Sequence, residues 1–464
     1  MSRYQKLAAN TALVSVGTFG SKLLVFLMVR FYTEWMHPAD YGTADLLTQT
    51  ANLLLPLVTL GITDGVFRYA IDRTGAQSRV FTIGFWTVTA GSALATFTCA
   101  ILAGLPEIGQ YGPLVVAFVA ASGYHSLCAQ FVRGLGKMRL FALQGLVNTA
   151  LMVAFSVLFL AVWPLGIAGY VGAFTLANLL TTCGLVLHER LWRALVARPG
   201  KRLAVQMLRY SLPLVPAAVF WWIMNVSDRY LVNLFLGPAA TGLYTVAGKI
   251  PTILTILAGM FLDAWQFSAT SEQHAGSEEH RRFYSQVWRV FTAGMLAAGS
   301  LLILTAPFSV EILADEDYLA AWRYVPILVL AMVVAAFSNF LGSVYVVFCR
   351  TGLSFATSLV GAVLNILLNL LLIPSFLGAQ GAAVATLVSC LAVFLIRAVN
   401  VRRFLPFTLH GAWLALALGL LAFQCVTMLL QFPGWSIACM LVTTLMLALS
   451  ARPLLQTFAV LRRK

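Results

Sequence analysis

The chain has 464 residues, of which 60% are hydrophobic and only 10% are charged, and its formal net charge is +14. A soluble domain of ordinary composition carries about 25% charged residues, so this composition excludes a water-soluble globular protein. Apolar runs recur along the chain, and most reach the roughly 18 residues needed to cross a hydrocarbon core. The alternating segments of about 10 residues that indicate a membrane β-barrel do not occur. The sequence therefore predicts an all-α polytopic membrane protein.

The first apolar run begins at Thr11, after Arg3 and Lys6, and contains Lys22. It is too long for the apolar region of a secretory signal and lacks a small-residue cleavage site, so we expect it to be retained as the first span. Fourteen spans are predicted, at residues 11–33, 45–67, 80–105, 112–133, 140–163, 165–188, 208–235, 240–268, 287–306, 324–349, 353–375, 380–400, 409–431 and 434–455. The connections are short. We expect the polar segment 188–202 to form an amphipathic interfacial helix.

Basic residues are concentrated in alternate connections. If the N-terminus is cytoplasmic, most of the 30 Lys and Arg residues fall on the cytoplasmic side, including Arg397 at the end of the twelfth span. The other connections carry acids instead, as in the segment "EILADED" at 311–317. This asymmetry is typical of the positive-inside rule and predicts that both termini are cytoplasmic. The positive net charge is then a topology signal, and we expect no nucleic-acid partner.

Three motifs recur in the same order along the chain. "PADYG" at 38–42 matches "PAATG" at 238–242, "FVRGLG" at 131–136 matches "FCRTGL" at 348–353, and "LGIAGYVGA" at 165–173 matches "LGAQGAAVA" at 377–385. An even number of spans separates the copies, so the repeats run parallel, as in transporters with two lobes around a central site. We predict an N-terminal lobe at 1–200, a C-terminal lobe at 201–403, each with six helices, and two further helices in 404–464.

Two predicted spans in equivalent positions carry polar stripes. In span 45–67 the spacing of 4, 3, 4, 3 and 4 residues places one set on a single helical face: Asp45, Gln49, Asn52, Pro56, Thr59 and Thr63. In span 240–268 a comparable face carries Thr245, Lys249, Thr252 and Asp263. Polar stripes at membrane depth face protein or water. They indicate either hydrogen bonds between helices or a shared hydrated cavity, and with Lys249 included we favour the cavity.

Cations lie in the paired spans 11–33 and 208–235. Lys22 has no acidic neighbour in its own helix, whereas Arg30 precedes Glu34 by four residues, a spacing suited to an ion pair. In "NVSDRYL", three residues share one face: Asn225, Asp228 and Arg229. Arg229 could be neutralised by Asp228 or extend to the membrane interface. A cavity lined by Lys22, Arg30, Arg229 and Lys249 would be net positive and would attract an anion.

Few acids lie inside the predicted spans. Asp64 and Asp263 are candidates for binding a coupling proton or sodium ion, or for pairing with a nearby cation such as Arg68. The seven cysteines and six histidines show no metal-binding or redox spacing, and no phosphate-binding loop motif occurs. Catalytic triads and paired carboxylates are also absent beside any sizeable loop. We therefore expect no metal, no cofactor and no enzymatic activity.

Several segments resemble one known family along essentially the whole chain: "YTEWMHPADYGTADLL", "SDRYLVNLFLGPAATGLYTVAGKI" and "GAVLNILLNLLLIPSFLGAQGAAVATL". They are similar to the polysaccharide-transporter branch of the multidrug/oligosaccharidyl-lipid/polysaccharide exporter superfamily. The resemblance implies a flippase that carries an undecaprenyl-pyrophosphate-linked oligosaccharide from the inner to the outer leaflet of the cytoplasmic membrane by alternating access. Family members place cations in the central cavity, and Lys22, Arg30, Arg229 and Lys249 are the positions that fit.

Other functions remain open at this point. A multidrug or organic-cation antiporter of the same superfamily would favour uncompensated acids in its cavity, and a lipid II flippase would share the anionic substrate class. A membrane-bound glycosyltransferase or polymerase would need a larger outer loop than 311–318 provides. The expected partners are a lipid-linked glycan and membrane lipid, and a polysaccharide polymerase or glycosyltransferases are further candidates. A scaffold that recruits such enzymes is also open.

Overall fold

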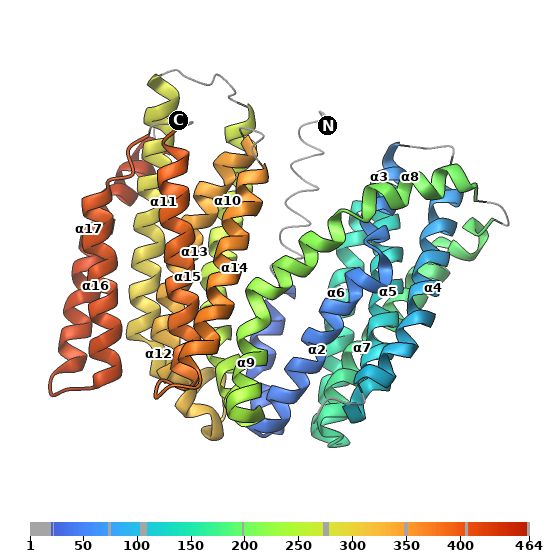
Figure 1. Ribbon diagram of the computed structural model, residues 1–464, viewed down its shortest axis with the longest axis horizontal. Helices are drawn as coiled ribbons and strands as arrows, with labels where there is room; N and C mark the ends of the chain where they lie inside the picture. The colour runs from blue at the N-terminus through green and yellow to red at the C-terminus, as the bar shows by residue number, and fades with distance from the viewer. Residues whose placement is uncertain are drawn as a thin grey trace. The chain divides into compact units, whose positions relative to one another are not determined.

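The computed structural model describes residues 20–21, 23–72, 76–102, 109–196, 199–271, 278–347, 351–403 and 407–461. Helices make up nearly all of this described part, which contains no β-strand (Figure 1). This confirms the all-α prediction. The helical content follows from the apolar composition, because a helix satisfies its backbone hydrogen bonds within its own segment and is therefore stable in lipid. The chain forms two compact units, Met1–Val226 and Ser227–Lys464.

Unit 1 is arranged around a central helix, α5. After a helical segment at 23–35, its elements are α2 (Pro38–Thr59), α3 (Ile62–Asp72), α4 (Gln77–Leu102), η1 (Gly109–Tyr111), α5 (Gly112–Gly134), α6 (Met138–Ser156), η2 (Val157–Val162), α7 (Gly166–Glu189), η3 (Leu191–Ala194) and α8 (Lys201–Ser211). Helix α5 packs against α2, α3, α4 and α7. Its inner face contributes Leu127, Phe131 and Val132 to an apolar core shared with α3, α4 and α8.

A break separates α2 from α3. The two helices are bent by 54°, and the residues between them, Leu60 and Gly61, have φ angles of 51° and 63°. A Cβ atom at Gly61 would lie 2.9 Å from the carbonyl oxygen of Ser211, and one at Gly65 would lie 2.5 Å from the Ser211 Oγ atom. The glycines therefore let α8 pack directly onto α3 beside the break.

The amphipathic helix of this region lies later than the sequence suggested. Residues 188–196 complete α7 and form η3, whereas the amphipathic segment is α8. Leu203 and Met207 of α8 are buried, and Arg202 and Arg209 are exposed. Gly200, with a φ of 92°, ends the preceding connection after Pro199, so a helix cannot run through these two residues. The prediction of an interfacial helix at 188–202 was therefore wrong in its position.

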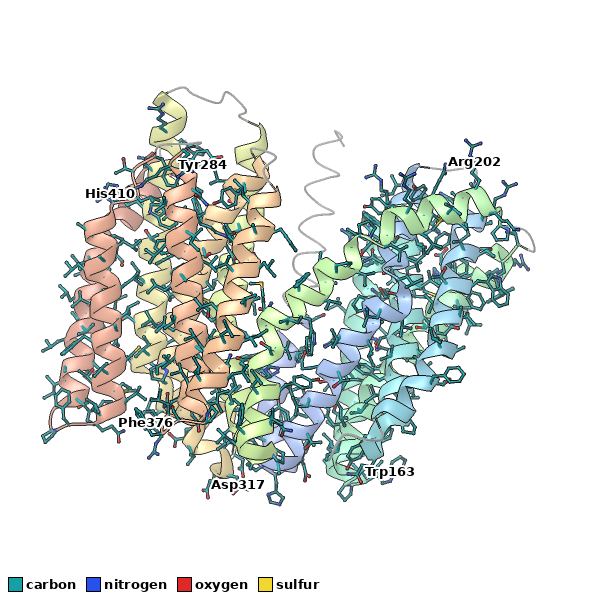
Figure 2. The ribbon with its side chains drawn as sticks, in the orientation of Figure 1. Trp163, Arg202, Tyr284, Asp317, Phe376 and His410 are labelled. Atoms are coloured by element: carbon teal, nitrogen blue, oxygen red, sulfur yellow. The ribbon has the colours of Figure 1, made fainter. Side chains whose placement is uncertain are left out.

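Unit 2 is arranged around α13. Its elements are the second part of α9 (Leu214–Lys249), α10 (Thr252–Ser271), α11 (Glu278–Leu304), α12 (Ala306–Leu313), η4 (Glu316–Arg323), α13 (Val325–Val347), α14 (Thr351–Leu372), α15 (Ala379–Val401), α16 (Gly411–Leu430) and α17 (Trp435–Leu461). Helix α13 packs against α10, α11, α14, α15 and α16. Within this unit, Asp317 lies at one end and Tyr284 and His410 lie at the other (Figure 2).

The two C-terminal helices are attached to unit 2 by a buried polar triad. Gln424 of α16 donates hydrogen bonds to the Ser300 carbonyl at 3.0 Å and to Thr443 Oγ1 at 2.9 Å, and it accepts one from Ser300 Oγ at 2.8 Å. Ser300 and Gln424 are fully buried and Thr443 is nearly so. Such bonds between helices hold a bundle together where the apolar surroundings offer no other partner.

By length and composition, ten helices of the described part can cross a membrane, or eleven if the bent pair α2–α3 counts as one span. The predicted number of fourteen is thus approximate, although each predicted span contains helix. The first lies partly outside the described residues, the seventh and eighth fall in one continuous stretch, Lys201–Leu262, and the last corresponds to a shorter apolar helix, Trp435–Ala451. The predicted division at residues 200 and 403 stays a prediction.

Candidate functional site

The predicted cavity cations are divided between the two units. Arg30 lies in the helical segment 23–35 of unit 1 and is partly buried, whereas Arg229 and Lys249 lie on α9 in unit 2 and are also partly buried. Lys22 lies outside the described residues. Each unit thus carries cations within predicted membrane spans, and their convergence on a common cavity stays a prediction.

Helix α9 folds back on itself and brings several predicted residues together. Gly237 has φ 84° and ψ 178°, so the helix is interrupted there, just before Pro238. The Tyr244 hydroxyl donates a hydrogen bond of 2.9 Å to Asp228 Oδ2. In a straight helix, residues that far apart would be separated by roughly 24 Å. The bond therefore shows that the arm before Gly237 and the arm after it lie against each other.

Arg229 follows Asp228 on the first arm. Its backbone N–H donates a hydrogen bond of 2.9 Å to Asp228 Oδ1, and its Nη2 atom would lie 4.0 Å from a Cβ atom built on Gly248. Gly248 precedes Lys249 on the second arm. The Arg229 side chain therefore reaches the second arm of α9, and the carboxylate beside it accepts a hydrogen bond from Tyr244.

The polar stripe of the second arm does not continue unchanged to its end. Thr245 is fully buried, whereas Thr252, at the start of α10, is exposed, and its hydroxyl donates to the carbonyl oxygen of Lys249. Thr245 therefore lies in the interior of unit 2, whereas Thr252 stabilises the junction between α9 and α10.

The polar residues of α2 also become more exposed along the helix. Asp45 is buried at 2% exposure, Gln49 is partly buried, and Asn52 is exposed. The indole Nε1 of Trp222 donates a hydrogen bond of 2.8 Å to the carbonyl oxygen of Gln49. This bond fastens the part of α9 that belongs to unit 1, which also carries the exposed Asn225, to α2. The assignment of these side chains to a cavity stays a prediction.

Of the two candidates for ion coupling, the structure describes the side chain of Asp64 but not that of Asp263. Asp64 is exposed on α3 and lies within electrostatic range of Arg133 of α5. The guanidinium of Arg133 lies over the Phe67 ring at 4.5 Å. Asp263 belongs to α10, and its side chain lies outside the described residues. A coupling role for either residue stays a prediction.

Arg397 is a buried cation whose place in the fold the sequence did not indicate. It is 5% exposed and donates to Thr357 Oγ1 at 3.0 Å, to the Ser338 carbonyl at 2.9 Å and to Ser358 Oγ at 2.9 Å. All these acceptors are neutral, and they come from α13 and α14. A Cβ atom at Gly342 would lie 2.7 Å from the Arg397 Nη1 atom, so glycine makes room for the guanidinium. Arg397 thus joins three helices of unit 2.

Two asparagine networks were also missed. Asn148 of α6 donates a hydrogen bond of 2.9 Å to Asn178 of α7, which donates to Ser122 of α5 at 2.9 Å. In unit 2, Asn365 of α14 donates to Thr386 of α15 at 3.3 Å. Asn148 and Asn365 differ by 217 positions, the same offset that separates "FVRGLG" at 131–136 from "FCRTGL" at 348–353, so the repeat itself could have pointed to the pair.

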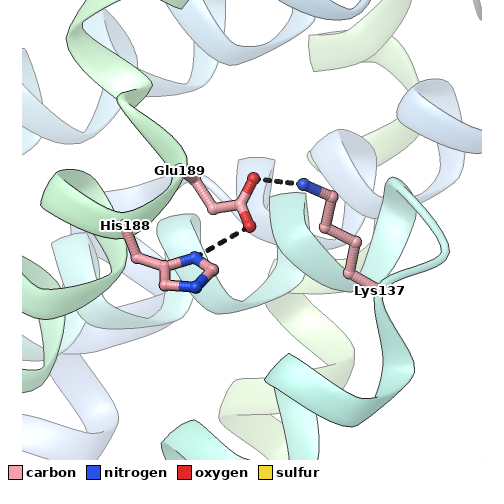
Figure 3. Close-up of polar contacts among 3 residues, drawn as sticks. All are labelled: Lys137, His188 and Glu189. Atoms are coloured by element: carbon pink, nitrogen blue, oxygen red, sulfur yellow. Dashed lines mark hydrogen bonds and ion pairs between the residues drawn. The ribbon is translucent and has the colours of Figure 1, made fainter.

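A charged cluster lies where the α5–α6 turn meets the end of α7 (Figure 3). Lys137 forms an ion pair with Glu189, whose other oxygen lies 3.1 Å from His188 Nδ1. These residues, with Arg139, line a hollow of about 450 Å³. The ion pair joins the turn between α5 and α6 to the end of α7. In the described part of the chain, no group of three His, Cys, Asp or Glu side chains is placed to hold a metal ion.

Known proteins share both the sequence pattern and the fold. Residues 7–266 match the family model described as polysaccharide biosynthesis protein. A probable low-salt glycan biosynthesis flippase, Agl15, of Haloferax volcanii is 26% identical over 200 residues, which cover 41% of this chain and 41% of that relative. The chain thus matches about two fifths of the length of that relative.

Two solved structures have the same fold. The lipid II flippase MurJ in an inward closed conformation aligns with a TM-score of 0.70 and 12% identity, covering 97% of this chain and all of that one. An inward-facing multidrug resistance MATE family transporter of the MOP superfamily aligns with a TM-score of 0.68 and 14% identity, covering 82% of this chain and 95% of that one. At these identities the likeness shows the fold alone. Because the family model matches more than half of its residues, the chain belongs to the polysaccharide biosynthesis protein family.

Proposed function

We propose that this protein is a flippase that carries an undecaprenyl-pyrophosphate-linked oligosaccharide from the inner to the outer leaflet of the cytoplasmic membrane, for the synthesis of a cell-surface polysaccharide. The family match over residues 7–266 carries this proposal. The name of the Haloferax relative, a glycan biosynthesis flippase, supports it.

The physical task fits a protein that performs no covalent chemistry. A pyrophosphate cannot enter hydrocarbon unaided, because an unpaired charge there costs on the order of tens of kcal/mol by Born solvation. A hydrated cationic path through the protein would remove that barrier while the lipid tail stays in the bilayer. We assign Lys22, Arg30, Arg229 and Lys249 to this path. The approach of the Arg229 side chain to Gly248, which precedes Lys249, supports the assignment of these two residues.

In this proposal, both termini lie in the cytoplasm. The protein partners are the polysaccharide polymerase and the glycosyltransferases of the same process. The asymmetric distribution of Lys and Arg supports the orientation. The division of the chain into two compact units supports transport by alternating access.

Headgroup inversion in proteoliposomes tests the proposal. A fluorescent undecaprenyl-pyrophosphate oligosaccharide is incorporated, and its exposure to a membrane-impermeant quencher is followed with time. Single variants Lys22→Ala, Arg30→Gln, Arg229→Gln and Lys249→Gln should each slow inversion about 10- to 100-fold, because a hydrogen bond to a charged group contributes roughly 1.5–3 kcal/mol. Arg402→Gln, at an exposed position, is the matched control.

The same proteoliposomes separate this function from its rival. If the cation variants invert the glycan lipid at the wild-type rate while the protein extrudes ethidium, the organic-cation antiporter is the correct function. If lipid II is inverted and the oligosaccharide lipid is not, the substrate class is peptidoglycan precursor.

A further inference from the structure

An apolar groove of about 600 Å³ opens on unit 1 between α2, α4 and α8. Its lining is apolar apart from the Thr87 hydroxyl and the Trp86 indole N–H, and it includes Leu57, Leu60, Ile83 and Leu94. Trp86 and Leu94 are 59% and 67% exposed. Ligand pockets measure about 300–1,000 Å³, so this groove is large enough for a bound hydrocarbon chain.

The groove is built by a close approach of two helices. A Cβ atom at Gly91 of α4 would lie only 1.8 Å from the carbonyl oxygen of Val58 in α2, so the backbones touch at this point. Leu57 and Leu60 line the groove immediately beside the break between α2 and α3. A molecule bound here would therefore contact the break itself.

Two cations stand at one end of the groove. On α4, Arg79 precedes the lining residues Ile83 and Trp86 by four and seven positions, and on α8, Lys201 precedes Ala204 and Leu208 by three and seven. These spacings place each cation on the helical face that lines the groove. Both side chains are exposed. Figure 2 shows Arg202, the neighbour of Lys201, at the end of unit 1 opposite to Trp163.

A buried threonine brings the two cations to the same end. The Thr82 hydroxyl, one turn after Arg79, donates to the Ala194 carbonyl at 3.2 Å and accepts from the Val196 N–H at 3.0 Å. This fastens the connection that leads into α8 to the start of α4. The first turn of α4 and the first turn of α8 therefore border the same end of the groove.

We propose that this groove binds one acyl chain of an anionic membrane phospholipid, with the lipid phosphate between Arg79 and Lys201. An apolar channel that ends at two cations complements a molecule with a hydrocarbon tail and a negative headgroup. Juxtamembrane Lys and Arg side chains attract anionic lipid headgroups in this way. Through Leu57 and Leu60, the bound chain packs against the bend and stabilises the bent arrangement of α2 and α3.

Lipid titration of the purified full-length protein in detergent, read by native mass spectrometry, tests the headgroup contact. Phosphatidylglycerol should bind more tightly than phosphatidylcholine with the same chains. Arg79→Gln/Lys201→Gln should weaken phosphatidylglycerol binding about 30-fold, which is about fivefold for each cation, and leave phosphatidylcholine unchanged. Arg402→Gln/Arg403→Gln removes the same charge from exposed positions of unit 2 and should have little effect.

Quenching by phosphatidylglycerol with brominated acyl chains tests the groove. The fluorescence of Trp86, obtained as the difference between wild type and Trp86→Phe, should be quenched. Ala90→Phe, which fills the groove, should abolish this quenching, whereas Ala93→Phe, at an exposed position of the same helix that does not line the groove, should preserve it. The surface charge variants provide an independent readout if Ala90→Phe fails to fold.

Three results would overturn the proposal. They are equal affinities for the two phospholipids, equal effects of the two double charge variants, and displacement of phosphatidylglycerol from the groove by undecaprenyl phosphate at lower concentration. The last result would make the carrier lipid the occupant. Because these assays measure binding without transport, their outcome is independent of the flippase assay.

Discussion

Tyr244 and Asp228 meet across the turn of α9, with the tyrosine hydroxyl 2.9 Å from Asp228 Oδ2. Asp228 also accepts a hydrogen bond from the backbone N–H of Arg229. One carboxylate therefore bonds to Tyr244 on the second arm of the helix and to Arg229 on the first. A change at Tyr244 should therefore affect the stability of unit 2.

We expect Tyr244→Phe to lower the free energy of unfolding by about 1–3 kcal/mol, because it leaves a partly buried acceptor without its donor. Thermal unfolding in detergent measures this cost, and Tyr210→Phe, at an exposed position on α8, is the matched control. In Asp228→Asn, the same tyrosine change should cost less. Equal costs in both backgrounds would show that the bond between the two residues contributes nothing.

Arg397 should resist replacement even by lysine. A lysine ammonium cannot reproduce the fork of donors that reaches Thr357, Ser338 and Ser358 at once. We expect Arg397→Lys to cost about 2–4 kcal/mol, the loss of two or more hydrogen bonds in a buried site. Arg402→Lys, at the exposed end of the same helix, should leave the melting temperature unchanged. If Arg397→Lys and Arg402→Lys both left the melting temperature nearly unchanged, the hydrogen bonds of Arg397 seen in the structure would not contribute to stability.

The equivalent place in unit 1 is apolar. At the offset of 212 residues, Arg397 corresponds to Leu185, and at 217 residues Thr357 corresponds to Leu140. Leu185 belongs to the core of unit 1, and Leu140 packs against that core. We therefore expect Arg397→Leu to be tolerated better than Arg397→Lys, because it removes the buried charge along with the hydrogen bonds. The melting temperatures of the two variants in the same detergent decide this order, and a lower value for the leucine variant would contradict it.

The sequence predicted the helices well, because a long apolar run has few structures open to it in lipid. It did not predict the role of Arg397. A single cation near the end of a span fits the positive-inside rule equally well, and the hydroxyl groups that surround Arg397 come from other helices. The Tyr244–Asp228 bond was missed for the same reason, since it depends on how tightly the arms of α9 fold together. The groove depends on the contact between Gly91 and Val58, which no local pattern indicates.

Gly237→Ala tests the turn between the two arms. The φ of 84° and ψ of 178° at this residue belong to a region that only glycine occupies readily, although a Cβ atom added there would meet no heavy atom within 4 Å. Strain of this kind costs about 1–3 kcal/mol, and we expect the melting temperature to fall accordingly. Gly259→Ala in α10 also meets no neighbouring atom and needs no unusual φ, so it should be neutral or slightly stabilising. Equal behaviour of the two variants would exclude the conformation observed at Gly237.

Gly91→Ala tests the contact between α2 and α4. Because the added Cβ atom would lie 1.8 Å from the Val58 carbonyl oxygen, the helices must separate, and we expect a loss of about 1–3 kcal/mol or more. Gly184→Ala, in the interior of α7 with no atom within 4 Å, should instead be neutral or stabilise the protein by up to about 1 kcal/mol. Thermal unfolding of both variants in the same detergent gives the comparison. A Gly91→Ala protein as stable as the Gly184→Ala protein would mean that the two backbones do not touch, and that the groove beside them is wider than the structure shows.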